Sequence, residues 1–182
     1  LLVKALKVVY NIFQIVVCSY IAWGLFPVDA LANPFSLGGK LSPVVERFVF
    51  YHYLTKFLDW CDTIFSIMAN RKDSVSFLHV FHHASIGPIW GYLLWEGYAS
   101  GTVAYGAFIN SVTHVIMYSH YLLKSLGIEN PLKRQVTQFQ LAQFMSCVVH
   151  AGLVCCGRDG VVPIRLAMLQ VMYHPIMLYL FG

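Results

Sequence analysis

The stretch FLHVFHHASIGPIW, residues 77–90, places three histidines among residues that are typical of a membrane span. His79, His82 and His83 stand at positions i, i+3 and i+4, so on a helix they share one face. The surrounding residues 75–95 otherwise have the length and apolar character of a transmembrane helix, which needs about 20 residues. Ionisable groups are costly in hydrocarbon and should point into a bundle. The stretch therefore predicts a helical membrane protein with a polar interior.

The composition of the whole chain supports this prediction. Of the 182 residues 58% are apolar and only 11% are charged, and the mean hydropathy is +0.65. A soluble domain of this size carries far more charge. The net charge is +4, but the basic residues flank apolar blocks and form no stripe with aromatic residues, which argues against a nucleic-acid partner. The five cysteines show no CxxC spacing, so we expect neither a disulfide framework nor a zinc site.

The apolar blocks predict an all-α, polytopic membrane bundle with six transmembrane helices. The blocks cover residues 8–25, 44–69, 75–95, 102–123, 136–156 and 161–181. Blocks of about 20 residues select helices over a membrane β-barrel. Seven Lys and Arg residues lie at the start, in the predicted turn at 70–74 and in the loop at 124–135, against four on the opposite side, so we expect the first side to be cytosolic. Residues 1–182 form one predicted domain, and we expect a fragment because the chain begins without Met and ends inside an apolar run.

Polar side chains from four of these helices fall at a similar depth near the predicted cytosolic side, given a rise of about 1.5 Å per residue. They are Asp59, Asp62, Thr63, His79, His82, His83, His114, Tyr118, Thr137, Gln140 and Gln143. Lys56 lies three residues before Asp59 and is its expected partner. We therefore predict one polar chamber that opens to the cytosol. The isolated His150 and His174 are more simply explained as hydrogen bonds between helices.

Neutral imidazole serves as a metal ligand, a proton carrier or a nucleophile. A metal-dependent membrane desaturase or hydroxylase is one alternative, but such enzymes use several histidine boxes and the other five histidines form no second box. Acyl transfer is another, because imidazole attacks thioesters and the surrounding amides and hydroxyls would stabilise an oxyanion. Cys61 is a competing nucleophile for that chemistry. A non-enzymatic carrier or scaffold that uses buried polar residues for packing is a further alternative.

The sequence resembles the membrane elongases of very-long-chain fatty acids, across nearly the whole chain. Four motifs of that family occur in order: KFLDWCDT at 56–63, HVFHH at 79–83, NSVTHVIMYSHY at 110–121 and TQFQLAQ at 137–143. Two positions depart from the family pattern. Asp59 stands in place of Glu, and His120 stands in place of Tyr, where we expect the interface rather than a catalytic role.

The resemblance implies a 3-oxoacyl-CoA synthase that condenses long-chain acyl-CoA, polyunsaturated chains included, with malonyl-CoA and releases CO2 and CoA. It implies that His82 takes the acyl group, that His114 faces it across the chamber, and that His79 and His83 orient groups or transfer protons. The remaining motif residues would bind substrate: Lys56, Asp59, Asp62, Thr63, Asn110, Tyr118, Thr137, Gln140 and Gln143. It further implies a barrel of six helices around the acyl chain, with the family's first helix missing. We expect no metal or cofactor, an endoplasmic reticulum membrane location, membrane lipid around the chain, and other elongation-cycle enzymes or a second copy as partners.

Overall fold

The computed structural model describes residues 2–27, 31–69, 75–129, 131 and 133–181, and every regular element in these ranges is helical. The helices are α1 Leu2–Gly24, α2 Pro43–Leu58, α3 Trp60–Met68, α4 Phe77–Trp95, α5 Ala104–Leu126, α6 Lys133–Cys155 and α7 Ile164–Phe181, with a short 3-10 helix η2 at Gly101–Val103. The all-α prediction is confirmed. The predicted polar turn at 70–74 lies outside the described residues.

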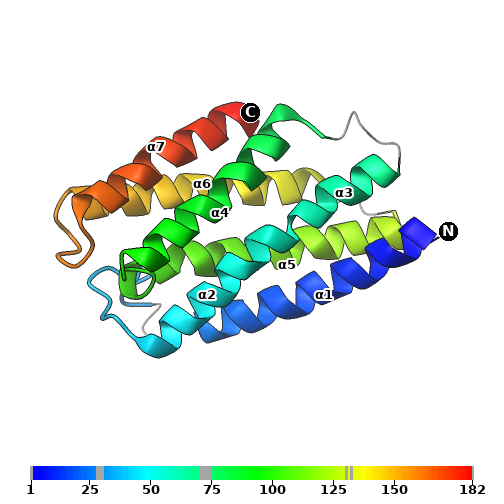
Figure 1. The fold of residues 1–182 in the computed structure, drawn as a ribbon. Coiled ribbons are helices and arrows are strands. Elements are labelled where there is room, and N and C mark those ends of the chain that lie inside the picture. Colours follow the sequence, from blue (N-terminus) through cyan, green and yellow to red (C-terminus); the bar gives the residue numbers. More distant parts are fainter. Residues whose placement is uncertain (1, 28–30, 70–74, 130, 132, 182) are drawn as a thin grey trace.

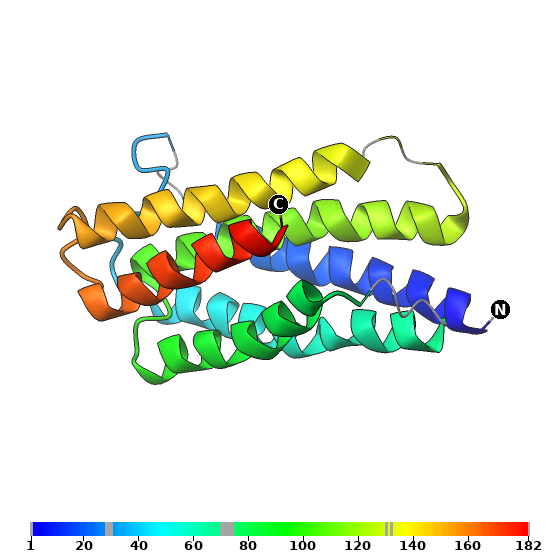
Figure 2. The same cartoon turned by 90° about the horizontal axis from the view of Figure 1, so that it is seen from above.

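The long helices run roughly side by side and close into a ring (Figures 1 and 2). Going round the ring, contacts join α1 to α5, α5 to α6, α6 to α7, α7 to α4, α4 to α2 and α2 back to α1. α2 and α3 follow each other along one side of this ring, so the seven α-helices of the described residues form six sides. The expected six-helix barrel is confirmed.

One predicted span is divided in two. Residues 44–69 were expected to form a single helix, but α2 ends and α3 begins around Asp59. The Asp59 N–H still donates to the Thr55 carbonyl at 2.9 Å, whereas the Asp62 N–H donates to the Asp59 carbonyl at 3.1 Å, three residues back. The helix therefore tightens by one 3-10-type turn at Asp59, a feature that often marks a functional position.

The bundle has two ends, which we call the N-terminal end and the far end (Figure 1). The N-terminal end holds the start of α1, the ends of α3 and α5 and the starts of α4 and α6. The far end holds the end of α1, the start of α2, the ends of α4 and α6 and the starts of α5 and α7. Near the far end α1 approaches α2 closely: a Cβ on Gly24 would lie 2.2 Å from a ring carbon of Phe48. Around this contact Ile21, Val49 and Trp90 form an apolar cluster, so this half of the bundle is densely packed.

By length and hydropathy alone, two helices in the described ranges qualify as membrane spans, α1 and α7. α2 and α3 are each too short, with 16 and 9 residues. α4, α5 and α6 carry polar side chains that lower their hydropathy, and many of these face the interior, as described below. Large apolar side chains cover the outside, among them Trp95 at 88% exposure and Trp23 at 74%. An apolar exterior around a polar interior is the arrangement expected in lipid.

Candidate active site

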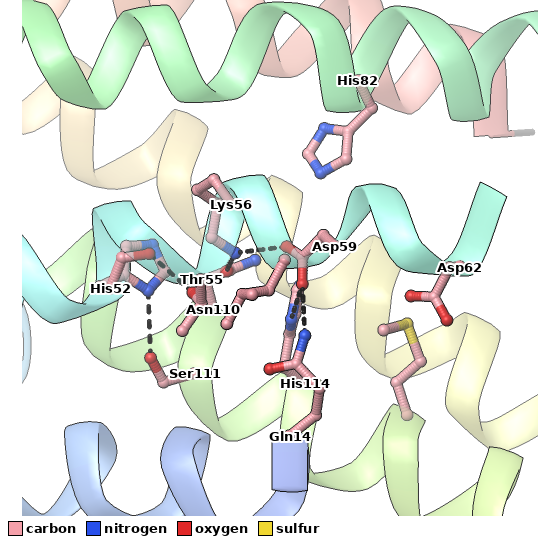
Figure 3. Close-up of polar contacts among 12 residues, drawn as sticks. Gln14, His52, Thr55, Lys56, Asp59, Asp62, His82, Asn110, Ser111 and His114 are labelled. Carbon is pink, nitrogen blue, oxygen red and sulfur yellow. Dashed lines mark hydrogen bonds and ion pairs between the residues drawn. The ribbon is translucent and has the colours of Figure 1, made fainter. Parts of the chain in front are cut away.

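Asp59, at the tightened turn, is the centre of a buried polar network (Figure 3). The Lys56 ammonium lies 3.1 Å from Oδ2 of Asp59, and both side chains are 1% exposed. The other carboxylate oxygen, Oδ1, accepts hydrogen bonds from Gln14 Nε2 and the Tyr118 hydroxyl, each at 3.0 Å. A buried ion pair is tolerated only when its remaining hydrogen-bonding groups are also satisfied. The predicted pairing of Lys56 with Asp59 is confirmed.

The network continues from α2 through α5 to α6. Lys56 Nζ donates to Asn110 Oδ1 at 2.9 Å, and Asn110 Nδ2 donates to Gln143 Oε1 at 3.4 Å. Each link fixes the amide orientation of the next residue, because an amide oxygen accepts while the amide nitrogen donates. The Gln143 Nε2 group is therefore directed away from Asn110.

A second branch of the network lies toward the N-terminal end. The Tyr118 hydroxyl also lies 2.7 Å from Asp62 Oδ2, so its single proton is within reach of both carboxylates and donates to one of them at a time. The Tyr10 hydroxyl lies 3.1 Å from that of Tyr118 and donates to the Leu58 carbonyl at 3.0 Å. The Tyr118 hydroxyl thus lies between the two aspartates, and Tyr10 contacts it from α1.

The histidines of α4 lie in its first two turns. Ser76 caps this helix, since its hydroxyl accepts from the His79 backbone N–H at 3.2 Å. The His79 Nε2 atom lies 2.8 Å from the Thr63 hydroxyl on α3, and the ring centroids of His79 and His83 are 4.4 Å apart. These contacts join α3 to α4, and they place His79 and His83 on one face of α4, as their i, i+4 spacing predicts.

His82 projects from α4 toward the α2–α3 turn (Figure 3). Its Nδ1 atom lies 3.0 Å from the Tyr173 hydroxyl on α7, and that hydroxyl lies 3.1 Å from the hydroxyl of Ser85. The ring is therefore held at one nitrogen, as is usual for a histidine whose other nitrogen does chemistry.

His114, on α5, lies beside the same carboxylate. Its Nδ1 atom is 3.8 Å from Asp59 Oδ1, too far for a hydrogen bond. Within the described chain, His114 Nδ1 and His83 Nδ1 are buried without a hydrogen-bond partner. Unpaired buried polar atoms are uncommon, and at a site they often mark groups that wait for a substrate.

Two cavities meet at His82. The wide cavity, with a volume of about 930 Å³, occupies the N-terminal end, and the narrow cavity, with about 80 Å³, extends toward the far end. The narrow cavity lies between α4, α5, α6 and α7, and its wall is mostly apolar. Four residues line both cavities: His82, Asn110, Gln143 and Phe144.

The predicted site residues divide into two groups. Those that line the wide cavity are Asp62, His79, His82, His83, Asn110, His114, Thr137, Gln140 and Gln143. Lys56, Asp59, Thr63 and Tyr118 lie behind this wall, where they hold the lining residues in place. Thr137 and Gln140 stay outside the polar network, with contacts to the Lys133 carbonyl and the Met117 sulfur.

Three partners in the site were not predicted from the sequence. Tyr10 and Gln14 come from α1, which reads as an ordinary apolar span, although a glutamine inside such a span signals a polar partner. Tyr173 on α7 is the partner of His82. No sequence motif marks it, because it lies in the middle of an apolar span, outside all four motifs.

The competing chemistries find less support in the geometry. Among the residues that the structure describes, no group of three or more His, Cys, Asp or Glu side chains is arranged to hold a metal ion. His79 and His82 instead contact hydroxyls. Cys61 is half-buried on α3 and lines neither cavity.

Comparison with known proteins identifies the wider group. The sequence model of the ELO: GNS1/SUR4 family matches residues 2–182. The chain is 47% identical to "Fatty acid elongase 5" of Leishmania major over 147 residues, which are 81% of this chain and 59% of that protein. It is 44% identical to "Fatty acid elongase 4" of Trypanosoma brucei brucei over 175 residues, 96% of this chain and 68% of that protein. It is 33% identical to human "Very long chain fatty acid elongase 5" over 122 residues, 65% of this chain and 40% of that protein.

Proposed function

Because the chain belongs to the ELO: GNS1/SUR4 family, whose members are multi-pass helical membrane proteins, we propose that it condenses long-chain acyl-CoA with malonyl-CoA to 3-oxoacyl-CoA, CO2 and CoA. The observation that carries this proposal is the position of His82 where a wide polar cavity meets a narrow apolar one. A fatty acyl thioester has the same two parts, a polar CoA and an apolar chain, and its reactive carbonyl lies between them.

The narrow cavity would take the acyl chain. On α6 it reaches from Gln143 to Val154, and on α4 from His82 to Leu93. Eleven residues of helix correspond to about 16 Å. A fully extended polypeptide backbone advances ~1.2 Å per covalent bond, and we take the same advance for an extended acyl chain. The depth of the narrow cavity therefore suits an acyl chain of roughly 14 bonds beyond the carbonyl.

His82 would be the nucleophile. With the Nδ1 proton donated to the Tyr173 hydroxyl, 3.0 Å away, the lone pair on Nε2 is free to attack the thioester carbonyl. CoA leaves as the thiolate and the acyl group stays on the imidazole. Malonyl-CoA then loses CO2, its enolate carbon attacks the acyl carbonyl, and the neutral imidazole leaves as 3-oxoacyl-CoA forms.

The surrounding groups would stabilise the charges that appear in these steps. Gln143 Nε2 points away from Asn110, whose own amide is held by Lys56, so it is available to donate to a carbonyl oxygen that becomes negative. His82 projects toward the turn that carries Asp59 (Figure 3), so this carboxylate would stabilise the positive charge that develops on the acylated imidazole. His114 and His83 line the wide cavity, where malonyl-CoA would enter.

The N-terminal end would face the cytosol, in the membrane of the endoplasmic reticulum. Lys4, Lys7 and Lys124 line the wide cavity at this end, and their charges suit both cytosolic orientation and the phosphates of CoA. Membrane lipid, other enzymes of the elongation cycle and a second copy of the chain stay predictions as partners.

The test is an in vitro assay with acyl-CoA and labelled malonyl-CoA. We expect labelled 3-oxoacyl-CoA from the wild-type protein and none above background from His82→Ala, with unchanged thermal unfolding of the variant. Val80, exposed on the same helix, provides a matched control, because Val80→Ala should keep activity. An active, folded His82→Ala protein would refute the proposal.

A further inference from the structure

The Asp159 carboxylate forms hydrogen bonds with three of the segments that connect helices at the far end. Asp159, between α6 and α7, is 8% exposed. Its Oδ1 accepts from the Gly38 N–H at 2.7 Å and from the Thr102 hydroxyl. Its Oδ2 accepts from the N–H groups of Val161 at 3.0 Å and Val162 at 2.6 Å. The α1–α2, α4–α5 and α6–α7 connections therefore meet on a single side chain.

Two of these connections are also joined directly. Ser100 Oγ accepts from the Ser42 N–H at 2.9 Å and donates to the Ser42 carbonyl at 3.0 Å. Next to this contact, a Cβ on Gly101 would lie 2.2 Å from the Gly39 carbonyl oxygen, and Gly101 has a φ of +54°. Only glycine fits such a close approach in that conformation. The far end is thus held by specific polar contacts.

These contacts position the bottom of the narrow cavity. Thr102 and Val162 line that cavity, together with Val103 and Leu166. Asp159 does not line it, but bonds the Thr102 hydroxyl and the Val162 backbone from behind. We call Thr102, Val103, Val162 and Leu166 the floor. Its position depends on Asp159 because the floor residues come from separate segments that this carboxylate joins.

We propose that Asp159 is a positioning residue for acyl-chain length: by holding Thr102 and Val162 it fixes the depth of the narrow cavity and so sets the longest chain that the enzyme accepts. This inference rests on the proposed function and extends it to specificity. Burial raises the pKa of Asp159, but its hydrogen bonds with Thr102, Val162, Gly38 and Val161 outweigh burial and leave the pKa below its ordinary value. The group therefore stays ionised and keeps its full capacity to accept.

The decisive experiment measures kcat/KM for saturated acyl-CoA substrates of increasing chain length. In Asp159→Asn an amide nitrogen replaces one accepting oxygen, so at least one of the four hydrogen bonds is lost. We expect the wild type to show a length cut-off and the variant to shift it by two or more carbons toward longer chains. For the first chain length beyond the wild-type cut-off, we compare kcat/KM with that for a short substrate. This ratio should be about tenfold higher in Asp159→Asn than in the wild type, since one methylene in an apolar pocket changes kcat/KM by roughly that much.

Two further variants test the same idea from different sides. Thr102→Val removes the hydroxyl that donates to Asp159 and should move the cut-off in the same direction. The control is Glu96→Gln, which breaks the ion pair with Arg165 at the same end although neither residue lines the narrow cavity, and its cut-off should stay unchanged. A purely structural role for Asp159 would lower activity at all lengths alike, and that result would overturn the inference.

If Asp159→Asn does not fold, Val162→Phe provides the test. The larger side chain would occupy space at the floor of the narrow cavity, while the backbone N–H of residue 162 still donates to Asp159. Its cut-off should move to shorter chains, and an unchanged cut-off would overturn the inference. Thermal stabilisation by acyl-CoA of increasing length provides a readout independent of turnover. If acyl-CoA stabilises the wild type up to a length limit but no condensation occurs, the proposed function is contradicted. The role of the floor is still tested in that case, because the length limit for stabilisation should shift in Asp159→Asn.

Discussion

Gln14 and Asp59, 45 residues apart in the chain, are joined by a hydrogen bond of 3.0 Å from Nε2 of Gln14 to Oδ1 of Asp59. Gln14 is 0% exposed and Asp59 is 1% exposed. This bond links α1, which carries none of the four sequence motifs, to the centre of the site. It is the reason that we expect α1 to matter for catalysis as well as for membrane insertion.

Replacing Gln14 tests this link. A hydrogen bond to a buried charged group contributes about 1.5–3 kcal/mol, so Gln14→Leu should lower the free energy of unfolding by about that amount and reduce condensation. Thermal unfolding in detergent and the condensation assay measure the two effects. Val16→Ala, on the exposed side of the same helix at 62% exposure, should unfold like the wild type. Equal stability of Gln14→Leu and the wild type would show that the bond is dispensable.

The Lys56–Asp59 pair should behave as a unit. Lys56→Met leaves the Asp59 carboxylate buried without its cation, which typically costs about 3–5 kcal/mol. The double variant Lys56→Met/Asp59→Asn removes both charges and should recover part of that loss. A double-mutant cycle on unfolding free energies gives the coupling. Additive effects of the two single substitutions would contradict a direct interaction.

Much of the site could be predicted from the sequence because its motifs are local. The spacing of His79, His82 and His83 fixes a shared helix face, and the three-residue spacing of Lys56 and Asp59 predicts their ion pair. The turn at Asp59 was not predicted. Both an uninterrupted helix and a tightened one satisfy the same apolar pattern, so only the three-dimensional contacts of Asp59 distinguish them.

The partners supplied by other helices were harder to predict. A glutamine in an apolar helix, such as Gln14, signals that some polar partner exists but not which helix provides it. Tyr173 lies 91 residues from His82, and its contact depends on how α7 packs against α4. The same holds for Asp159, whose hydrogen bonds reach Gly38 and Thr102 in distant connections.

Tyr173→Phe should separate orientation of the nucleophile from substrate binding. The substitution removes the hydroxyl 3.0 Å from His82 Nδ1 and keeps the ring that packs beside it. We expect kcat to fall about tenfold or more while KM for acyl-CoA changes little. Ser85→Ala, which removes only the outer contact to Tyr173, should have a smaller effect. A rise in KM with unchanged kcat would instead place Tyr173 in chain binding.

The contribution of Asp159 to stability should depend on pH. Its pKa in the folded protein lies below the ordinary value of 3.8. The stabilisation is therefore present above the unfolded pKa and is lost as the pH falls through the folded one. The difference in melting temperature between the wild type and Asp159→Asn should be largest near neutral pH and should shrink below about pH 3.8. A melting-temperature difference that stays constant down to about pH 3 would contradict a stabilising role for the ionised Asp159 carboxylate.

The most direct test of the account is mass analysis of the protein after incubation with acyl-CoA alone. We predict an added mass equal to the acyl group on a peptide that contains His82, and its loss when malonyl-CoA is supplied. Cys61→Ala should form the same adduct. If the protein condenses the two substrates yet carries no acyl group, or carries it on Cys61, the acyl-imidazole mechanism at His82 is wrong.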